Sequence, residues 1–370
     1  MEDQIEQAKR NDSGGVPQSS QKSHDIDEEL ENLIEQRKAD IKVIGTGGAG
    51  NNTISRLVDV GIEGCDTVAM NTDAQDLLYA NADQKVLIGK ELTQGLGAGA
   101  DPKVGEESAK ESQQKIKEQV KGSDMVFITC GLGGGTGTGS AHVIAEQAKK
   151  EGALTVGIVT LPFEMEGTSR QENAEYGLER LEEVVDTLIV IPNDKLLEIV
   201  PDVSLNTAFK IADEILVNAV KGVTELVTKP GLVNLDFADI SAVMGEGGIA
   251  MIGMGQSDTD SRANEAVQKA LSNPLLDVDI AGGEGALVNV TGGSSLSLNE
   301  AQEVVNTVSG KLDDTAKIIW GAQVREDMSD ALQAMIIVTG VDSPQIYGPE
   351  KTHQDEYEEE IEQELGVEFI

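Results

Sequence analysis

The chain has 370 residues, with 66 Asp and Glu against 28 Lys and Arg, for a formal net charge of −38. Residues 1–40 carry −6 and residues 350–370 carry −8, so the body between them carries −24. Because nucleic acids and anionic membranes repel such a surface, the charge excludes non-specific binding to either. Hydrophobic residues make up 39%, and 41 residues are glycine, which indicates folded domains with many turns or a backbone that closely approaches a ligand.

The first 40 residues are predicted to form an N-terminal extension. Residues 1–24 are polar and rich in Gly, Ser and Gln, which is typical of a disordered lead. Residues 25–38 place their apolar side chains on one helical face, which predicts a short amphipathic helix. The acidic start is not a signal peptide, and no run in the chain approaches about 18 apolar residues. We therefore expect a cytoplasmic protein without direct membrane insertion.

From residue 41 onward, apolar β-rich runs alternate with helical segments. The predicted strands are 41–45, 67–70, 85–89, 124–130, 154–161 and 187–192, and the predicted helices are 51–60, 103–121, 139–150 and 170–184. Continuous apolar strands that alternate with helices indicate a parallel sheet with both faces covered. We therefore predict an α/β domain of Rossmann type over residues 41–202.

A long central helix is predicted over residues 203–228, where apolar residues recur at helical spacing. At 1.5 Å per residue it would span about 39 Å, enough to bridge two domains. A smaller α+β domain is predicted over 229–342, and residues 343–370 form an acidic tail. The predicted helices of this domain are 236–244, 260–271 and 298–312, and its strands are 250–255, 285–292, 317–324 and 334–341.

The first of two glycine loops follows the strand 41–45. Gly45, Gly47 and Gly50 satisfy the pattern GxGxxG, in which backbone N–H groups approach a phosphate at a helix N-terminus. Alone, this pattern is commonest in dinucleotide sites, so an NAD-type Rossmann oxidoreductase is one alternative. That site needs an acid after the second strand, and the segment Asn71-Thr72-Asp73 is only a loose match.

The second loop, GLGGGTGTGS over 131–140, follows the strand 124–130 and leads into the helix predicted from 139. Five glycines and two threonines in the seven residues 133–139 are too many for packing. They favour a nest of N–H donors and hydroxyls sized for a di- or triphosphate. The loop has no Lys or Arg, so backbone dipoles and a divalent cation must neutralise the phosphates.

With this second loop the sequence resembles the FtsZ family, the prokaryotic tubulin-like division GTPases, in its archaeal branch. The resemblance covers about residues 40–342 and implies a polymerising GTPase that forms the cell-division ring. It also implies a GTP-binding domain joined by a long central helix to a smaller α+β domain. The supporting motifs are GGAGNN (47–52), NTDAQ (71–75), GGGTGTG (133–139), PFEMEG (162–167), IPNDKL (191–196), NLDFADI (234–240), SNPLLD (272–277) and IIWGA (318–322).

The resemblance assigns nucleotide contacts residue by residue. Phe209 would stack on the guanine, Asp213 would accept hydrogen bonds from its N1 and N2 edge, and Glu166 and Arg170 would contact the ribose. The residue types alone leave alternatives open: core packing for Phe209, a solvated face for Asp213, and a surface ion pair for Glu166 and Arg170. The loop positions implied to surround the phosphates, sugar and metal are Gly47, Gly48, Ala49, Gly50, Asn51, Asn52, Asn71, Asp73, Gly134, Gly135, Thr136, Gly137, Thr138 and Gly139.

A third site comprises Asn234, Asp236 and Asp239 at the start of the helix 236–244. Ordinary N-terminal capping would explain the two acids without any resemblance. The resemblance places them instead in a loop that inserts into the next subunit's nucleotide pocket and polarises the attacking water. Hydrolysis would then occur at a head-to-tail contact and be activated by self-assembly.

The expected cofactors are GTP or GDP and Mg²⁺, with K⁺ as an additional candidate. The metal would be held mainly by the phosphates, without a direct protein ligand set, and Asp236 and Asp239 are its candidate protein contacts. A remaining alternative is a non-hydrolysing structural paralogue, which predicts loss of Asp236 or Asp239, yet both are present.

The acidic tail ends in the largely apolar segment 365–370. The resemblance implies a short peptide that binds a membrane-anchoring division protein in a groove, with a frayed end as the alternative. The expected partners are therefore other copies of the chain and this anchor, and the expected location is the division site at mid-cell.

Overall fold

The computed structural model describes residues 39–199, 204–229, 232–233, 235–245, 247–276, 280–313 and 315–341. The predicted helix 25–38, Asn234 and the tail 343–370 lie outside these residues. The strands are β1 (Ile41–Thr46), β2 (Asp66–Asn71), β3 (Gln84–Leu87), β4 (Met125–Gly131), β5 (Leu154–Leu161), β6 (Thr187–Pro192), β7 (Gly248–Ser257), β8 (Gly285–Gly292), β9 (Lys317–Val324) and β10 (Leu332–Thr339). The α-helices are α3 (Gly47–Asp59), α4 (Ala74–Tyr79), α5 (Lys90–Thr93), α6 (Pro102–Glu111), α7 (Gln113–Val120), α8 (Thr136–Lys150), α9 (Thr168–Glu182), α10 (Asn193–Ile199), α11 (Leu205–Thr228), α12 (Phe237–Met244), α13 (Arg262–Leu271) and α14 (Leu298–Ser309).

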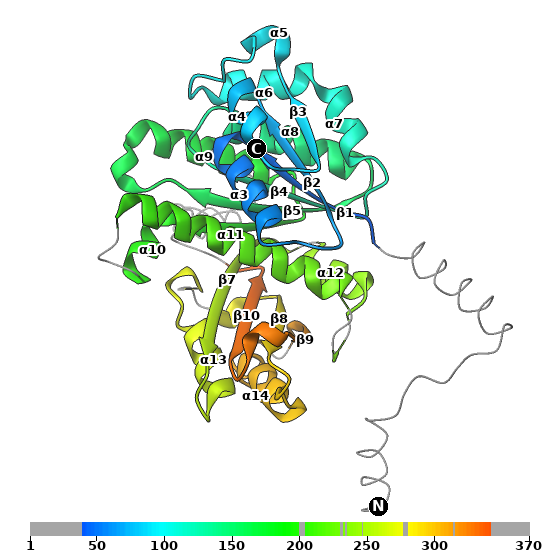
Figure 1. Cartoon of the computed structure of the whole chain (residues 1–370), viewed down its shortest axis with the longest axis vertical. Helices are drawn as coiled ribbons and strands as arrows, with labels where there is room; N and C mark the ends of the chain where they lie inside the picture. The colour runs from blue at the N-terminus through cyan, green and yellow to red at the C-terminus, as the bar shows by residue number, and fades with distance from the viewer. Residues whose placement is uncertain are drawn as a thin grey trace, which may run out of the picture. The chain divides into compact units, whose positions relative to one another are not determined.

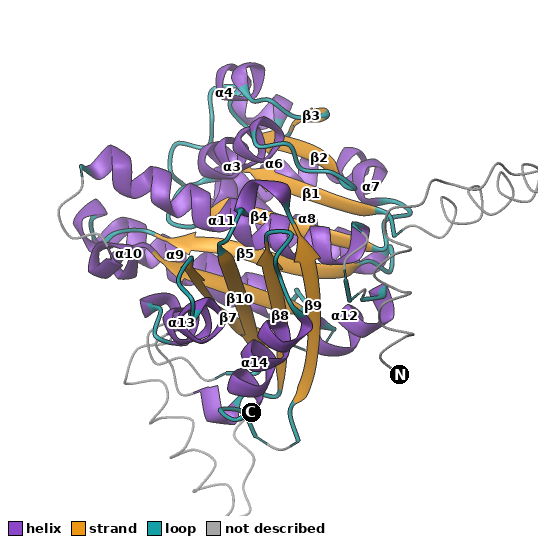
Figure 2. Cartoon of the chain, turned by 60° about the horizontal axis from the view of Figure 1, so that its bottom comes forward, coloured by secondary structure: helices purple, strands orange, loops and turns teal. Residues whose placement is uncertain are grey.

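The strands form one mixed sheet of ten strands in the order β3-β2-β1-β4-β5-β6-β7-β10-β8-β9. From β3 to β7 every neighbouring pair is parallel. Strand β10 runs antiparallel to both β7 and β8, and β9 closes the edge parallel to β8. Figure 1 shows β7, β10, β8 and β9 side by side below α11, and Figure 2 shows the same four strands beside α13 and α14. The predicted α/β fold class, with a mostly parallel sheet, is confirmed.

Helices cover both faces of this sheet because its central strands are apolar on both sides. On β1, the neighbouring side chains of Val43 and Ile44 are fully buried in opposite cores. The core that contains Ile44 is completed by side chains of α6, α7, α8, α9, α13 and α14. The core that contains Val43 is completed by side chains of α3, α10, α11 and α12.

Helix α11 has 24 residues, which corresponds to about 36 Å, and it contacts α3, α10, β5 and β8. Ser204 caps its N-terminus by accepting a hydrogen bond from the Thr207 N–H. Buried Ala212, Leu216 and Val223 lie at helical spacing on its inner face. The observed bounds agree with the long helix predicted over 203–228. The helix contacts β5 in the parallel part of the sheet and β8, which pairs antiparallel with β10.

Three predicted helices differ from the observed ones, and three observed helices were not predicted. The helix predicted over 103–121 is two helices, because Ser112 leaves helical geometry (φ −99°, ψ 15°) and its hydroxyl accepts from the Gly89 N–H at 2.9 Å. Helices α3 and α8 begin at Gly47 and Thr136, inside the glycine loops, not at 51 and 139 as predicted. Glycine lowers helix propensity but does not prevent a helical first turn, where N–H groups need no partner in the helix. The predictions omitted α4, α5 and α10.

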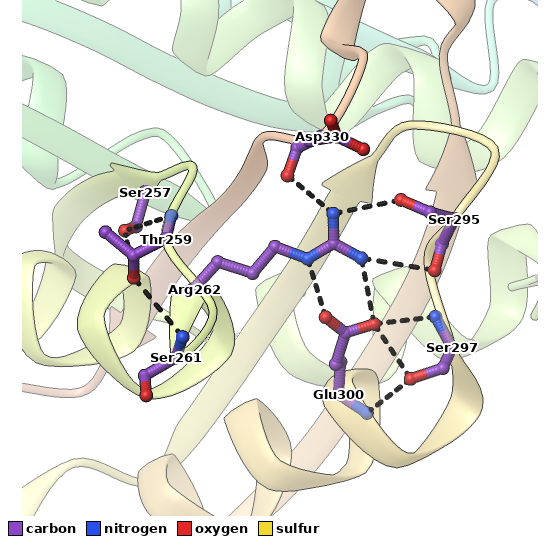
Figure 3. A network of polar contacts seen from close by, with 8 residues as sticks. All are labelled: Ser257, Thr259, Ser261, Arg262, Ser295, Ser297, Glu300 and Asp330. Atoms are coloured by element: carbon purple, nitrogen blue, oxygen red, sulfur yellow. Dashed lines mark hydrogen bonds and ion pairs between the residues drawn. The ribbon is translucent and has the colours of Figure 1, made fainter.

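A polar network around Arg262 joins α13 to α14 and to the segment before β10 (Figure 3). The guanidinium, at the first residue of α13, donates to both carboxylate oxygens of Glu300 on α14, at 2.6 and 3.1 Å. It also donates to the Ser295 hydroxyl and to the Asp330 carbonyl in the segment before β10. The Arg262 hydrogen bonds, together with those from Ser297, lower the pKa of Glu300 to about 2. This pairing fixes α13, α14 and the approach to β10 relative to one another.

Candidate functional site

A cavity of about 380 Å³ lies at the carboxyl ends of the parallel strands. Strand order reverses between β1 and β4, because the chain runs from β1 outward to β3 and then returns to β4. Ligands of open α/β sheets bind at such switch points, where the loops after neighbouring strands diverge. Both glycine loops occupy this position, and both contribute to the lining of the cavity.

The first glycine loop directs the N-terminus of α3 at the cavity. Gly47 has φ +73°, a conformation that glycine adopts without strain, and Gly47, Gly48 and Ala49 line the cavity. Asn51 is buried beneath the loop, and its neighbours assign the orientation of its amide: the nitrogen then donates to the carbonyls of Met70 and Gly45, and the oxygen accepts from Asn71 Nδ2. The free N–H groups of the first helical turn thus face the cavity while Asn51 anchors the loop to β2.

The second loop combines an open backbone with close packing. Gly133 has φ +99°, and its N–H donates to the Thr138 hydroxyl at 3.0 Å. Gly139 packs against α6 so closely that an added Cβ would lie 1.9 Å from the Pro102 carbonyl oxygen. The sequence predicted that the glycines of this loop serve a ligand and not packing. At Gly139 that prediction is wrong, because close packing requires the glycine. Gly134, Gly135, Thr136 and Gly137 line the cavity.

Thirteen of the eighteen residues predicted to contact a nucleotide line this one cavity. They are Gly47, Gly48, Ala49, Asn71, Asp73, Gly134, Gly135, Thr136, Gly137, Glu166, Arg170, Phe209 and Asp213. The other five do not line it: Gly50, Asn51, Thr138 and Gly139 are buried behind the loops, and Asn52 is exposed on α3. A direct role for these five stays a prediction.

The α11 side of the cavity presents an aromatic ring and a carboxylate. Phe209 is 38% exposed, and its ring packs edge-to-face on buried Phe163, with ring centroids 5.3 Å apart. Asp213 lies one turn further along the same helix. Burial raises the pKa of Asp213 to about 6, an effect that nearby Arg56 opposes and Glu214 reinforces. A carboxylate that gives up solvation without gaining a firm partner is available to a ligand.

Glu166 and Arg170, four residues apart in the sequence, form an ion pair. Arg170 Nη1 lies 3.0 Å from Glu166 Oε2, with the arginine side chain half exposed. The other oxygen of Glu166 accepts from the Phe163 N–H at 2.9 Å, so this carboxylate is held in place at the cavity wall. The pair lines the cavity, which leaves both the surface-pair interpretation and the ribose contact open.

The sequence predictions missed several cavity-lining residues, of which Asn193 is the most informative. Asn193 follows β6, is only 5% exposed, and its Oδ1 has no hydrogen-bond partner in the described structure. The placement of Asn193 in the IPNDKL motif, directly after a strand, was the available signal. The other missed residues are Thr46, Asp76, Gly97, Gly131, Leu132, Thr160, Pro162 and Ala212.

The acids predicted to be catalytic form a capping box on α12. The Asp239 N–H donates to Asp236 Oδ1 at 2.8 Å, and the Asp236 N–H donates to Asp239 Oδ2 at 3.3 Å. Both residues are exposed, and neither lines the cavity. Asn234 lies outside the described residues. Capping therefore accounts for the local geometry of both acids, and their catalytic role stays a prediction.

The charges around the cavity are mainly negative. Asp73, Asp76, Glu166 and Asp213 line it, and Arg170 is the single Lys or Arg among the described lining residues. Across the described part of the chain, no group of three or more His, Cys, Asp or Glu side chains is placed to hold a metal ion. In the same residues, no helix is both long enough and apolar enough to cross a membrane.

Comparisons with known proteins agree with this fold. The Tubulin/FtsZ family, GTPase domain, matches residues 40–201, and the FtsZ family, C-terminal domain, matches residues 248–342. The cell division protein FtsZ 1 of Thermococcus kodakarensis is 59% identical over 344 residues, covering 93% of this chain and 92% of the relative. That of Methanocaldococcus jannaschii is 61% identical over 317 residues, covering 86% and 87%.

Solved structures of FtsZ and CetZ proteins have the same fold. An empty FtsZ dimer of M. jannaschii superposes with a TM-score of 0.82 at 61% identity, covering 85% of this chain and 92% of that one. GDP-bound CetZ1 from Haloferax volcanii superposes with a TM-score of 0.74 at 25% identity, covering 86% and 99%. None of these matches supports the NAD-type oxidoreductase. The chain belongs to the FtsZ family of tubulin-like GTPases, the cell-division proteins of prokaryotes.

Proposed function

We propose that this chain assembles head to tail into filaments and hydrolyses GTP at the contact between subunits to build the division ring. The observation that carries the proposal is the convergence of two helix N-termini, Phe209 and Asp213 on one cavity, while the candidate catalytic acids lie outside it. A nucleotide bound there needs a second copy to bring Asp236 and Asp239 to its phosphates.

The phosphates would lie against the first turns of α3 and α8. Both turns present unpaired backbone N–H groups and the positive end of a helix dipole, which together favour an anion. The Thr136 hydroxyl adds a side-chain donor at the same place. The loop residues thus supply the donors that Lys or Arg supplies in other phosphate sites.

The base would lie against α11. Phe209 offers a half-exposed ring for stacking, and the Asp213 carboxylate can accept two N–H bonds from guanine, which adenine cannot offer. Asn193 supplies a buried, unpartnered amide oxygen as a further acceptor. The ion-paired Glu166 and Arg170 would contact the ribose between base and phosphates.

The charge of the cavity fits a bound Mg²⁺. Four carboxylates and one guanidinium line it, so a triphosphate would enter a site that is already negative. Asp73 and Asp76 also line the cavity and would offer carboxylate oxygens, the ligand type that Mg²⁺ prefers, beside the phosphate oxygens that would mainly hold the ion. Bound there with the phosphates, the cation would offset the charge on their oxygens, and K⁺ could add to this screening.

The two candidate catalytic acids would act in the neighbouring subunit's site. There the exposed carboxylates of Asp236 and Asp239 would accept hydrogen bonds from the attacking water and orient it at the terminal phosphate. The FtsZ dimer of M. jannaschii supports self-association of this chain. Asn234, adjacent to these acids, would share the same role.

Exposed apolar side chains occur on both segments that would meet. Leu96 and Met165, 83% and 72% exposed, adjoin the cavity-lining Gly97 and Glu166. Leu232, 61% exposed, lies shortly before Asp236. Apolar side chains at both ends of the proposed contact would be buried on assembly, which favours it.

GTP hydrolysis per subunit is expected to show a threshold in protein concentration, because the site is completed by assembly. With a net charge of −38, subunits repel each other, so the threshold should fall severalfold between about 0.1 M and 1 M KCl as the Debye length shrinks from about 10 Å to about 3 Å. The measurement is phosphate release against protein concentration at fixed GTP and Mg²⁺. Activity strictly proportional to concentration, or a flat salt response, contradicts the proposal. NaCl at equal concentration separates a specific effect of K⁺ from screening.

We further propose that residues 365–370 bind a membrane-anchoring partner and so place the filament at mid-cell. Deleting these residues is expected to leave the GTPase threshold unchanged but to abolish ring placement, because the segment lies far along the chain from the cavity residues. Fluorescence localisation of the full and shortened chains measures this. Replacing the same residues by a Gly/Ser stretch of equal length controls for tail length, and normal placement of either variant would overturn the assignment.

A further inference from the structure

Two buried hydroxyl pairs lie beneath the phosphate side of the cavity. Thr72 Oγ1 is 2.6 Å from Thr136 Oγ1, and Thr46 Oγ1 is 2.6 Å from Ser140 Oγ. Thr72, Thr46 and Ser140 have 0% exposure, whereas Thr136 is partly exposed and lines the cavity. Each pair ties the first turns of α8 to the end of a neighbouring strand, and each hydroxyl has a single proton to donate.

The direction of the second pair follows from Ser140. Its hydroxyl donates to the Thr136 carbonyl at 2.6 Å, so its proton is used. Ser140 must then accept from Thr46, whose proton points into the protein. Although Thr46 lines the cavity, it presents only lone pairs there, which do not attract a phosphate.

The direction of the first pair follows from burial. Among the described residues, the Thr72 hydroxyl has one hydrogen-bond partner, Thr136 Oγ1. If Thr136 donated, the Thr72 proton would be left unpaired in the interior, which is unfavourable. Thr72 therefore donates and Thr136 accepts. The Thr136 proton is then free, because no other hydrogen bond of this hydroxyl occurs among the described residues, and it is available to the cavity that Thr136 lines.

We propose that Thr72 is a positioning residue that presets the Thr136 hydroxyl as a donor to a nucleotide phosphate. The inference rests on the proposed nucleotide site and deepens it. A preset donor matters here because carboxylates outnumber cationic side chains around the cavity. Thr72 is itself held in place, since its carbonyl accepts from the Thr93 hydroxyl at 3.2 Å and the Gly97 N–H at 3.3 Å.

Thr72→Val is expected to lower GTP affinity about fivefold, the effect of one ordinary hydrogen bond, because an unoriented Thr136 hydroxyl donates less well. Affinity for guanosine, which has no phosphate, should stay unchanged, and Thr72→Ser should restore GTP affinity. Thr187→Val is the matched control, because Thr187 is equally buried, lies at the other end of the parallel strands and donates to the Met244 carbonyl. Titration calorimetry with GTP and guanosine measures all four proteins.

A double-mutant cycle separates this inference from the proposed site. Thr136→Val should also lower GTP affinity, and adding Thr72→Val should cause no further loss, since the donor is already gone. If Thr136→Val weakens GTP but Thr72→Val does not, the positioning role is wrong while the phosphate site stands. If Thr136→Val leaves GTP affinity unchanged, the Thr136 hydroxyl does not hold a phosphate and the positioning role is wrong. The phosphate site itself, whose main donors are backbone N–H groups, is overturned only if the wild-type protein binds GTP no more tightly than guanosine. If Thr72→Val lowered the affinities for GTP and guanosine equally, Thr72 would have only a packing role.

Discussion

Replacing Asp239 with alanine is expected to lower GTP turnover about 100-fold or more while leaving GTP affinity unchanged. A carboxylate that orients and polarises the attacking water typically contributes 10²–10⁴-fold, so about 100-fold is the low end. Affinity should persist because Asp239 does not line the cavity of its own chain. Phosphate release under assembling conditions and GTP binding below the threshold concentration measure the two quantities separately.

The capping box on α12 makes a second variant necessary. Asp239 accepts a hydrogen bond from the Asp236 N–H, so alanine also removes a cap, at a cost of about 1 kcal/mol of stability. Asp239→Asn keeps an oxygen for that bond but removes the charge. It should therefore retain the melting temperature and still lose turnover. Normal turnover in Asp239→Asn would show that the acid acts through the cap and not on water.

A mixing experiment tests whether the site is shared between subunits. Asp239→Ala has an intact cavity, and Asp213→Ala has intact acids on α12, so each alone is inactive at low GTP. If the two variants assemble at random in equal amounts, about a quarter of the contacts join the two intact halves. Turnover should then recover to about that fraction of the wild-type rate. A mixture no more active than its components would exclude catalysis across the contact.

The sequence predicted the sheet and the glycine loops well because both depend on local composition. The run Leu154–Leu161 is apolar on both faces apart from Thr155 and Thr160, which is typical of a strand buried on both sides. The starts of α3 and α8 were wrong because propensity disfavours glycine in helices, whereas the fold uses glycine there for close approach. Gly139 is the clearest example, since its nearest neighbour belongs to α6, about 40 residues away in the chain.

The burial of Asn193 without a hydrogen-bond partner and the Thr72–Thr136 pair could not be predicted from the sequence for a different reason. Whether an asparagine is buried without a partner, or which of two hydroxyls is enclosed, depends on several segments packing together. For Asp236 and Asp239, the sequence allowed helix capping as an alternative to a catalytic role, and α12 does begin with this capping box. The sequence pattern supports capping and catalysis equally, because an acid at a helix start is suited to both.

Replacing Asp213 with alanine is expected to lower GTP affinity about 100-fold and leave ATP affinity unchanged. The variant loses two hydrogen bonds from guanine to a charged acceptor, each worth about 1.5–3 kcal/mol, of which part is recovered by water. ATP offers this carboxylate no matching pair of donors, so the GTP-over-ATP preference should largely disappear. Glu214→Ala is the matched control, because Glu214 pairs with Arg56, does not line the cavity and carries the same charge. An unchanged preference in Asp213→Ala would mean that the base is recognised elsewhere.

The raised pKa of Asp213 adds a pH signature to the same residue. With a pKa of about 6 in the free protein, the carboxylate is ionised at pH 7.5 and only about one-tenth ionised at pH 5. Since guanine binds the ionised form, GTP affinity should fall about tenfold over this range. The contribution of Asp213 to folding stability changes with pH in the opposite direction. Its folded-state pKa lies above the unfolded value near 3.8, so the ionised carboxylate destabilises the folded protein. The nucleotide-free protein therefore gains stability from this group as pH falls from about 6 to about 4. Asp213→Asn removes both effects while the phosphates of GTP still titrate, so the difference between the two proteins isolates Asp213. Equal pH profiles for GTP binding by the two proteins would show that this carboxylate does not hold the base.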